Sequence, residues 1–125
     1  MKLLLDSHVL LWWLDDPALL SMVARDAISD PSNDVLVSAA MVWEIVIKSG
    51  LGKLAIPADL DKVIVRSGFQ YLAVNSVHAF AVQQLPLHHR DPFDRMLVAQ
   101  AIVESATIIT RDANIVRYPA NCIGA

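Results

Sequence analysis

Most of the 13 acidic residues of this 125-residue chain lie in predicted turns or on polar helix faces, and four carboxylates do not fit that pattern. They are Asp6, Glu44, Asp94 and Asp112. A carboxylate is costly to bury unless it is hydrogen-bonded, paired or bound to a metal. Carboxylate oxygens are the ligands that Mg²⁺ and Mn²⁺ prefer, and these ions activate water and stabilise the leaving oxygen during phosphodiester cleavage. The residue types therefore predict a divalent-metal site that acts on phosphodiesters.

Asp6 and Glu44 each have a structural alternative. Asp6 directly follows the apolar residues 3–5 and can cap the helix that starts near Ser7. Glu44 is the only charged residue in the window 39–47, and on an exposed helix it would form an i,i+4 ion pair with Lys48 that is worth roughly 0.2–0.5 kcal/mol. The apolar neighbours of Glu44 predict a buried side chain and favour a functional role.

Asp94 and Asp112 have alternatives of the same kind. Asp91 can be the N-cap of a helix whose first residue is Pro92, and Asp94 would then lie in its first turn as part of a capping box. One of these two carboxylates suffices for the cap, so we interpret Asp91 as the cap first and as a ligand second. Asp112 follows another apolar run and can be a turn residue.

The elements that must position these side chains alternate along the chain. Four short apolar runs predict buried strands, at Lys2–Leu5, 35–37, 71–74 and Thr107–Thr110. Helical patterns cover residues 9–14, 18–29, 39–49, 59–67, 77–85 and 91–104. Strands that alternate with helices and lack hairpin turns predict an α/β fold with a parallel sheet, in which sites gather at the carboxyl ends of the strands. We expect one domain over residues 1–125.

Composition excludes several classes of protein. Hydrophobic residues make up 55% of the chain and charged residues 18%, which is incompatible with a disordered tail. The formal charge of −3 excludes nucleic-acid binding by bulk positive charge, although removing the four carboxylates would leave +1. The longest stretch without Asp, Glu, Lys or Arg, residues 67–89, contains too many polar residues for a membrane span. We expect a cytoplasmic protein.

Zinc is disfavoured as the metal. Cys122 is the single cysteine, and the four histidines lack a helical zinc-binding spacing. His88 and His89 are adjacent, so we expect their side chains to diverge in a loop.

Four segments resemble, in order, the motifs of PIN-domain ribonucleases. They are residues 3–12, 38–45, 85–101 and 109–112. The third, LPLHHRDPFDRMLVAQA, is the most specific. The match covers nearly the whole chain and looks most like the VapC branch, the toxins of type II toxin–antitoxin modules.

The resemblance implies a three-layer α/β/α PIN-like domain with a central parallel sheet of four to five short strands. It also implies a Mg²⁺-dependent endoribonuclease, with Mn²⁺ as a substitute, that cuts RNA and pairs with a VapB-type antitoxin. By motif position, Asp6, Glu44 and Asp94 form the central acidic site, and Asp112 completes it as an outer or second-metal ligand. Ser7 keeps the hydroxyl of the Thr that often follows the first Asp in this family, and we expect it to bind substrate.

Further side chains are candidates for binding RNA or protein. Bidentate phosphate contacts suit Arg90, Arg95 and Arg111, with surface ion pairing as the alternative. The resemblance implies frequent homodimerisation, for which the apolar candidates are Trp12, Trp13, Leu20 and Val46. An apolar groove for the antitoxin is predicted at Trp43, Ile47 and Leu51.

Two other functions stay open from the sequence. One is a PIN-like domain that binds RNA or a protein partner without cutting. The other is a phosphotransfer domain, which the sequence disfavours because the segment Asp6–Ser7–His8 lacks the second Asp of a D-x-D phosphatase motif.

Overall fold

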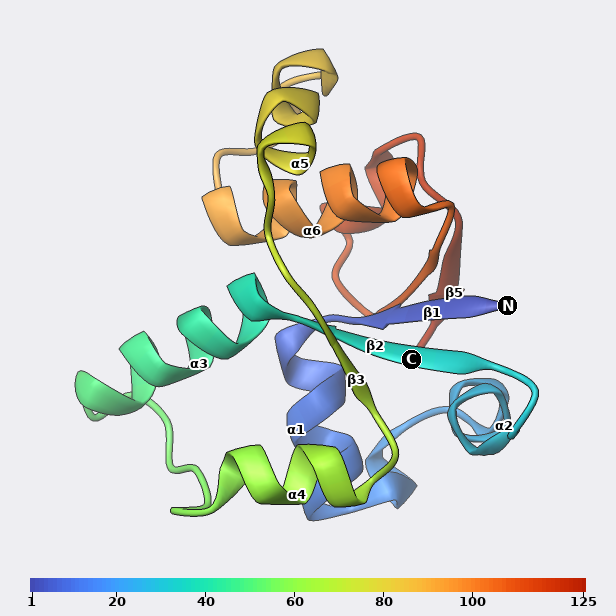
Figure 1. Cartoon of the computed structure of the whole chain (residues 1–125), viewed down its shortest axis with the longest axis vertical. Helices are drawn as coiled ribbons and strands as arrows, with labels where there is room; N and C mark the ends of the chain where they lie inside the picture. The colour runs from blue at the N-terminus through green and yellow to red at the C-terminus, as the bar shows by residue number, and fades with distance from the viewer.

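The computed structural model describes all 125 residues and contains one five-stranded sheet in which every pair of neighbouring strands is parallel. The strand order is β3-β2-β1-β4-β5 (Figure 1). The strands are β1 (Lys2–Leu5), β2 (Asp34–Ser38), β3 (Gln70–Leu72), β4 (Thr107–Thr110) and β5 (Cys122–Gly124). The predicted parallel α/β sheet of four to five strands is confirmed.

β1 lies at the centre of the sheet. Leu3 pairs with Val35 of β2 on one side and with Thr107 of β4 on the other. From β1 the chain first builds β2 and β3 on one side, and then crosses to build β4 and β5 on the other. The direction of winding therefore reverses between β1 and β4, and such a switch point is where ligands bind in open α/β sheets.

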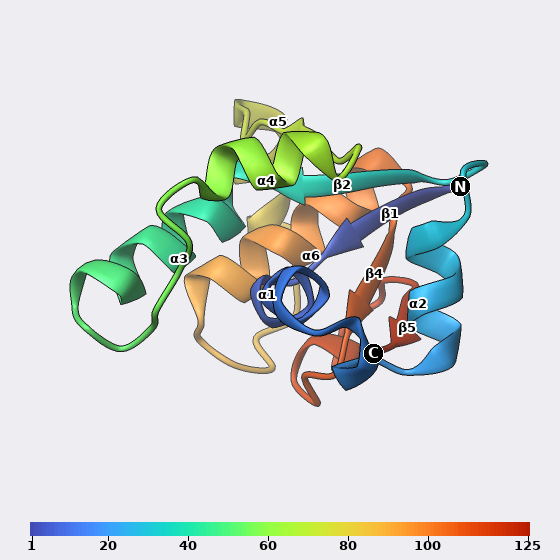
Figure 2. The same ribbon diagram turned by 90° about the horizontal axis from the view of Figure 1, so that it is seen from below.

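Helices cover both faces of the sheet and give three layers (Figure 1, Figure 2). One face carries α1 (Ser7–Asp15), α2 (Met22–Ser29) and α4 (Leu60–Arg66), and the other carries α5 (Ser76–Ala81) and α6 (Pro92–Glu104). α3 (Ala39–Gly50) continues from the carboxyl end of β2 and packs against both α1 and α6. Three short 3₁₀ turns, η1 (Pro17–Leu19), η2 (Val82–Gln84) and η3 (Ile115–Arg117), complete the chain.

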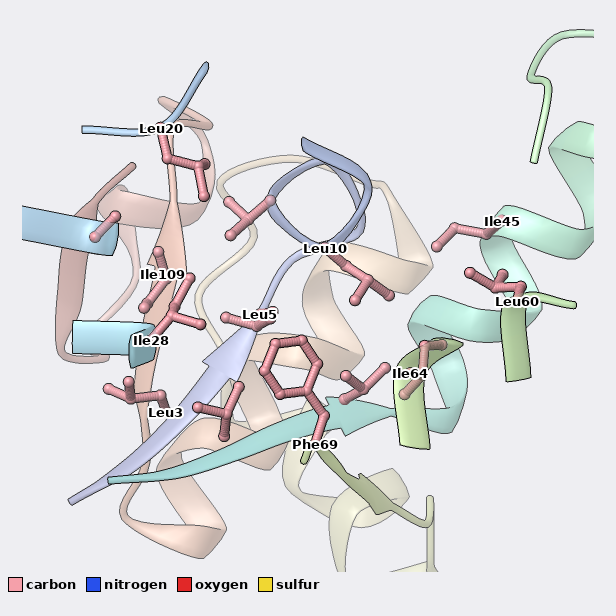
Figure 3. Packing of buried hydrophobic residues seen from close by; sticks show 14 residues of the cluster. Leu3, Leu5, Leu10, Leu20, Ile28, Ile45, Leu60, Ile64, Phe69 and Ile109 are labelled. Carbon is pink, nitrogen blue, oxygen red and sulfur yellow. The ribbon is translucent and has the colours of Figure 1, made fainter. Parts of the chain in front are cut away.

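The central strand contributes to two hydrophobic clusters, one on each face of the sheet. Leu3 and Leu5 point toward Leu10 of α1 and Ile64 of α4 (Figure 3), whereas Leu4 belongs to the cluster around α6. Alternate residues of a strand point to opposite faces, so burial on both faces requires the continuous apolar run seen in β1.

The predicted helix over residues 18–29 is wrong as a single element. It is divided into η1 and α2 by an extended segment at Leu20 and Ser21. The Ser21 hydroxyl accepts a hydrogen bond from the Ala24 backbone N–H at 3.1 Å, which caps α2, and donates to the Gly124 carbonyl of β5 at 2.8 Å. A capping side chain that also binds a neighbouring strand therefore stabilises the break.

The edge strand β5 was not predicted, and the helix expected over 77–85 is α5 followed by the separate turn η2. Leu20 is only 4% exposed and packs in the core, so its assignment to a dimer interface is wrong. Val46 is 52% exposed and stays available for a partner. None of the helices is long and apolar enough to cross a membrane.

Candidate active site at the carboxyl edge of the sheet

Asp6 is held at the carboxyl end of the central strand by donors from two elements. Its Oδ1 accepts from the Val9 backbone N–H at 2.9 Å, so the predicted cap of α1 is confirmed. Its Oδ2 accepts from the Thr110 hydroxyl of β4. The side chain is buried, and these hydrogen bonds from α1 and β4 replace those that water would make.

Asp112 lies next to Asp6 through Thr110. The Asp112 backbone N–H donates to Thr110 Oγ1 at 3.0 Å, and that hydroxyl donates onward to Asp6. Asp112 Oδ1 accepts from the Asn114 N–H at 2.7 Å, so the predicted turn role of Asp112 is confirmed as well. The chain reversal after β4 thereby brings a second acid to the switch point between β1 and β4.

Asp91 and Asp94 divide the roles at the start of α6. Asp91 Oδ1 accepts from the backbone N–H groups of Phe93 and Asp94 at 2.9 and 3.1 Å, so Asp91 is the N-cap as expected. The Asp94 side chain takes no part in the cap, so the expected capping box does not form. Its Oδ2 lies 3.1 Å from Nε2 of His89, which leaves Oδ1 free for another ligand.

Glu44 is both buried and paired. Its side chain is 5% exposed, and Oε2 lies 2.9 Å from the Lys48 ammonium one turn along α3. The predicted ion pair therefore forms, between a buried carboxylate and a Lys48 side chain that is 41% exposed. Oε1 is also buried but accepts no hydrogen bond at all. Such an unpartnered oxygen costs free energy unless a further cation or donor reaches it.

The electrostatics place these acids in one cluster. Burial, together with the charges of Asp91, Asp112 and Glu44, raises the pKa of Asp94 to about 6, against the lowering effect of its hydrogen bond to His89. Burial also raises the pKa of Asp6, in which Asp112 is a minor additional cause. An acid whose charge raises the pKa of Asp94 or Asp6 lies near that residue, and a cation among these acids would have the opposite effect on the pKa.

The donor set fits a hard divalent cation. The available groups are carboxylate oxygens, the type that Mg²⁺ and Mn²⁺ prefer, and the unpartnered Oε1 of Glu44 adds a site for positive charge. In this conformation no three His, Cys, Asp or Glu side chains lie close enough together to hold a metal ion. Asp6, Asp94 and Glu44 instead bind Thr110, His89 and Lys48.

The four side chains predicted to bind substrate differ in their surroundings. Ser7 is buried in the first turn of α1, and Arg90 is exposed in the loop before α6. The Arg95 guanidinium donates to the Pro86 carbonyl at 2.9 Å and to the Tyr118 hydroxyl at 3.0 Å. Arg111 binds two backbone carbonyls and stacks over Trp12 at 4.4 Å. Arg95 and Arg111 therefore have intramolecular partners that the sequence did not indicate.

His89 and Tyr118 were missed as site residues. The rings of His88 and His89 do not diverge as expected, because both pack against Tyr118, at centroid distances of 4.9 and 5.4 Å. The position of His89 inside the most specific motif, five residues before Asp94, was the available indication. Tyr118 lies outside that motif, and its contact with His89 depends on the folded chain.

The sequence model of the PIN domain family matches residues 3–121. The chain is also 36% identical to Ribonuclease VapC22 of Mycobacterium tuberculosis over 118 residues, which cover 87% of this chain and 85% of the relative. The chain belongs to the PIN domain family.

Solved structures with the same fold extend over the whole of this PIN domain. VapBC2 from Rickettsia felis, bound to a DNA fragment from its promoter, superposes with a TM-score of 0.75 at 16% identity and covers 99% of this chain and 98% of that one. DNA-bound VapBC from Salmonella typhimurium gives 0.72 at 15% identity, with coverage of 99% and 98%. These likenesses establish the α/β PIN fold.

The raised pKa of Asp94 predicts a pH-dependent effect of Asp94→Asn on stability. A folded pKa of about 6, above the ordinary 3.8, means that this carboxyl favours the fold at low pH and loses that contribution as pH rises through 6. Without metal, the variant should unfold with a free energy higher than wild type by on the order of 1–2 kcal/mol at neutral pH, with no gain near pH 4. Urea unfolding at both pH values measures this, and a variant less stable than wild type at neutral pH would contradict it.

The ion pair on α3 predicts a second stability effect. Lys48→Met leaves both oxygens of buried Glu44 without a partner, so the free energy of unfolding should fall by about 1–3 kcal/mol at neutral pH. The double variant Lys48→Met/Glu44→Gln contains no buried unpaired charge and should recover most of the lost free energy of unfolding. Equal losses in the single and double variants, measured by thermal unfolding, would show that Glu44 needs no cation.

Proposed function

We propose that this PIN domain is a Mg²⁺-dependent endoribonuclease and acts as the toxin of a VapBC-type toxin–antitoxin pair. The observation that carries the proposal is electrostatic: burial raises the pKa of Asp6 at the end of β1 and of Asp94 at the start of α6, the charge of Asp112 adds to both shifts, and the charge of Glu44 adds to that of Asp94. The 36% identity to a protein named as a ribonuclease supports the same activity.

The candidate ligands for Mg²⁺ are Asp6, Glu44, Asp94 and Asp112. When bound, Mg²⁺ supplies Lewis-acid stabilisation of the phosphate and an activated water. The protein's own part is to fix the carboxylates, with Thr110 orienting Asp6 and His89 orienting Asp94. α1 and α6 both begin beside the acids, and their N-terminal N–H groups add the partial positive charge that favours an RNA phosphate.

The proposed partner is an antitoxin, since the structural relatives are toxin–antitoxin complexes. An apolar surface suited to it lies beside the acids on α3, where Trp43, Ile47 and Leu51 are 62%, 37% and 65% exposed. A cavity of about 430 Å³ adjoins Trp43, whose ring meets Phe93 edge to face at 5.3 Å. An antitoxin segment held there would place a basic side chain, such as Arg, among the carboxylates and neutralise them.

We further propose that the protein is cytoplasmic and that it forms a homodimer. Val46 remains exposed for such an interface, and Trp12 and Trp13 are half-buried on α1. The rival function, a PIN domain that binds RNA without cutting it, shares the fold and the basic side chains but needs no intact set of acids.

The cleavage assay separates these two functions. Asp6→Asn and Asp94→Asn should each reduce Mg²⁺-dependent cleavage of RNA at least ~10²-fold, because each removes a charge that supports the transition state. Asp26→Asn changes an exposed acid on α2 and should cleave like wild type. Near-wild-type cleavage by a site variant would remove that residue from the mechanism. Wild-type protein that binds RNA in Mg²⁺ but leaves it intact would establish the rival function.

A further inference from the structure

A hydrogen-bonded chain of four side chains leads away from the candidate ligand Asp94. Asp94 Oδ2 lies 3.1 Å from His89 Nε2, and His89 Nδ1 lies 2.8 Å from the Tyr118 hydroxyl. That hydroxyl lies 3.0 Å from NH1 of Arg95. The four groups come from the loop before α6, from α6 itself and from the segment after η3, so only the folded chain brings them together.

The Tyr118 oxygen fixes the direction of every hydrogen bond in this chain. Two of its neighbours can only donate: the Arg95 guanidinium at 3.0 Å and the His89 backbone N–H at 3.3 Å. Together they use the two lone pairs of the hydroxyl. The remaining neighbours are Nδ1 of His89 at 2.8 Å and the His89 carbonyl at 3.5 Å, and the hydroxyl has one proton to give.

The proton of Tyr118 goes to Nδ1, which is the nearer neighbour. A protonated Nδ1 would find no free lone pair on the Tyr118 oxygen, so Nδ1 must accept. A neutral imidazole that accepts at Nδ1 carries its proton on Nε2, and Nε2–H then donates to Asp94 Oδ2. Arg95 cannot lose its proton and must donate to Tyr118. It thereby determines that Nε2 of His89 is the donor to Asp94 at the other end of the hydrogen-bonded series.

We propose that Tyr118 is a positioning residue which fixes the His89 tautomer, so that His89 holds Asp94 Oδ2 and leaves Asp94 Oδ1 directed to the cation. This deepens the proposed function and rests on it for the identity of the cation. Arg95 acts in the same chain as the obligatory donor, which gives this residue of the most specific motif a role other than substrate contact. Partners of this kind, which orient a metal ligand, typically affect metal affinity by 10–100-fold.

The first test is the tautomer of His89 in the metal-free protein. Long-range ¹H–¹⁵N spectra of wild type at about pH 7.5 should show His89 with its proton on Nε2. His89→Gln assigns its signals by their loss. In Tyr118→Phe the Nδ1 acceptor loses its donor, and the signals should move toward a mixture of tautomers. Tyr71→Phe is the matched control, because Tyr71 is the only other tyrosine and its hydroxyl binds Asp61 instead.

The second test is Mg²⁺ affinity by calorimetry on the same proteins. Tyr118→Phe should bind Mg²⁺ about tenfold more weakly, and Tyr71→Phe should match wild type. His89→Gln keeps an N–H donor in place of Nε2 and should retain more affinity than His89→Phe, which has none.

The outcomes distinguish this inference from the proposed function. A wild-type His89 protonated on Nδ1, or on both nitrogens, would overturn the inference, and that result does not depend on metal binding. An unchanged Mg²⁺ affinity in Tyr118→Phe would overturn the positioning role. Wild-type protein that shows the expected tautomer but binds no Mg²⁺ would confirm the hydrogen-bond chain and contradict the proposed function.

Discussion

The rest of the fold depends on one constraint: the carboxylate of Asp6 must be accommodated at the buried end of the central strand β1. β1 has a hydrogen-bonded neighbour on each side, so the chain leaves the sheet at Asp6 in a position from which water is largely excluded. Desolvation disfavours the ionised carboxylate, and hydrogen bonds from Val9 and Thr110 offset that cost. The central strand can carry an acid only because α1 and β4 both supply donors to it.

Two further acids near this edge of the sheet are also compensated for desolvation by a neighbouring side chain. Each of the other buried acids is matched by one side chain close to it in sequence, Glu44 by Lys48 and Asp94 by His89. These partners reduce the repulsion without removing it, because the pKa of Asp94 still stands well above its ordinary value and one oxygen of Glu44 has no partner. The remaining unbalanced charge is the physical reason to expect a cation at this edge.

The sequence predicts the alternation of strands and helices well because both faces of the sheet are buried, which requires continuous apolar runs. It fails where tertiary contacts decide the structure. β5 is a three-residue edge strand, and α2 begins only at Met22, after its N-cap Ser21, whose hydroxyl also donates to Gly124 of β5. The acids themselves are visible because they interrupt apolar surroundings. The partnership of His89 and Tyr118 is not, because it joins residues 29 apart whose side chains meet only in the folded chain.

Anomalous diffraction from crystals grown or soaked with Mn²⁺ tests most directly whether the clustered acids form a cation site. We expect one dominant peak at the switch point between β1 and β4, within about 2.5 Å of carboxylate oxygens from Asp6 and Asp94, a distance set by oxygen coordination of such ions. Dominant Mn²⁺ density on other acids, or none at this edge while Asp94 stays bound to His89, would contradict the account.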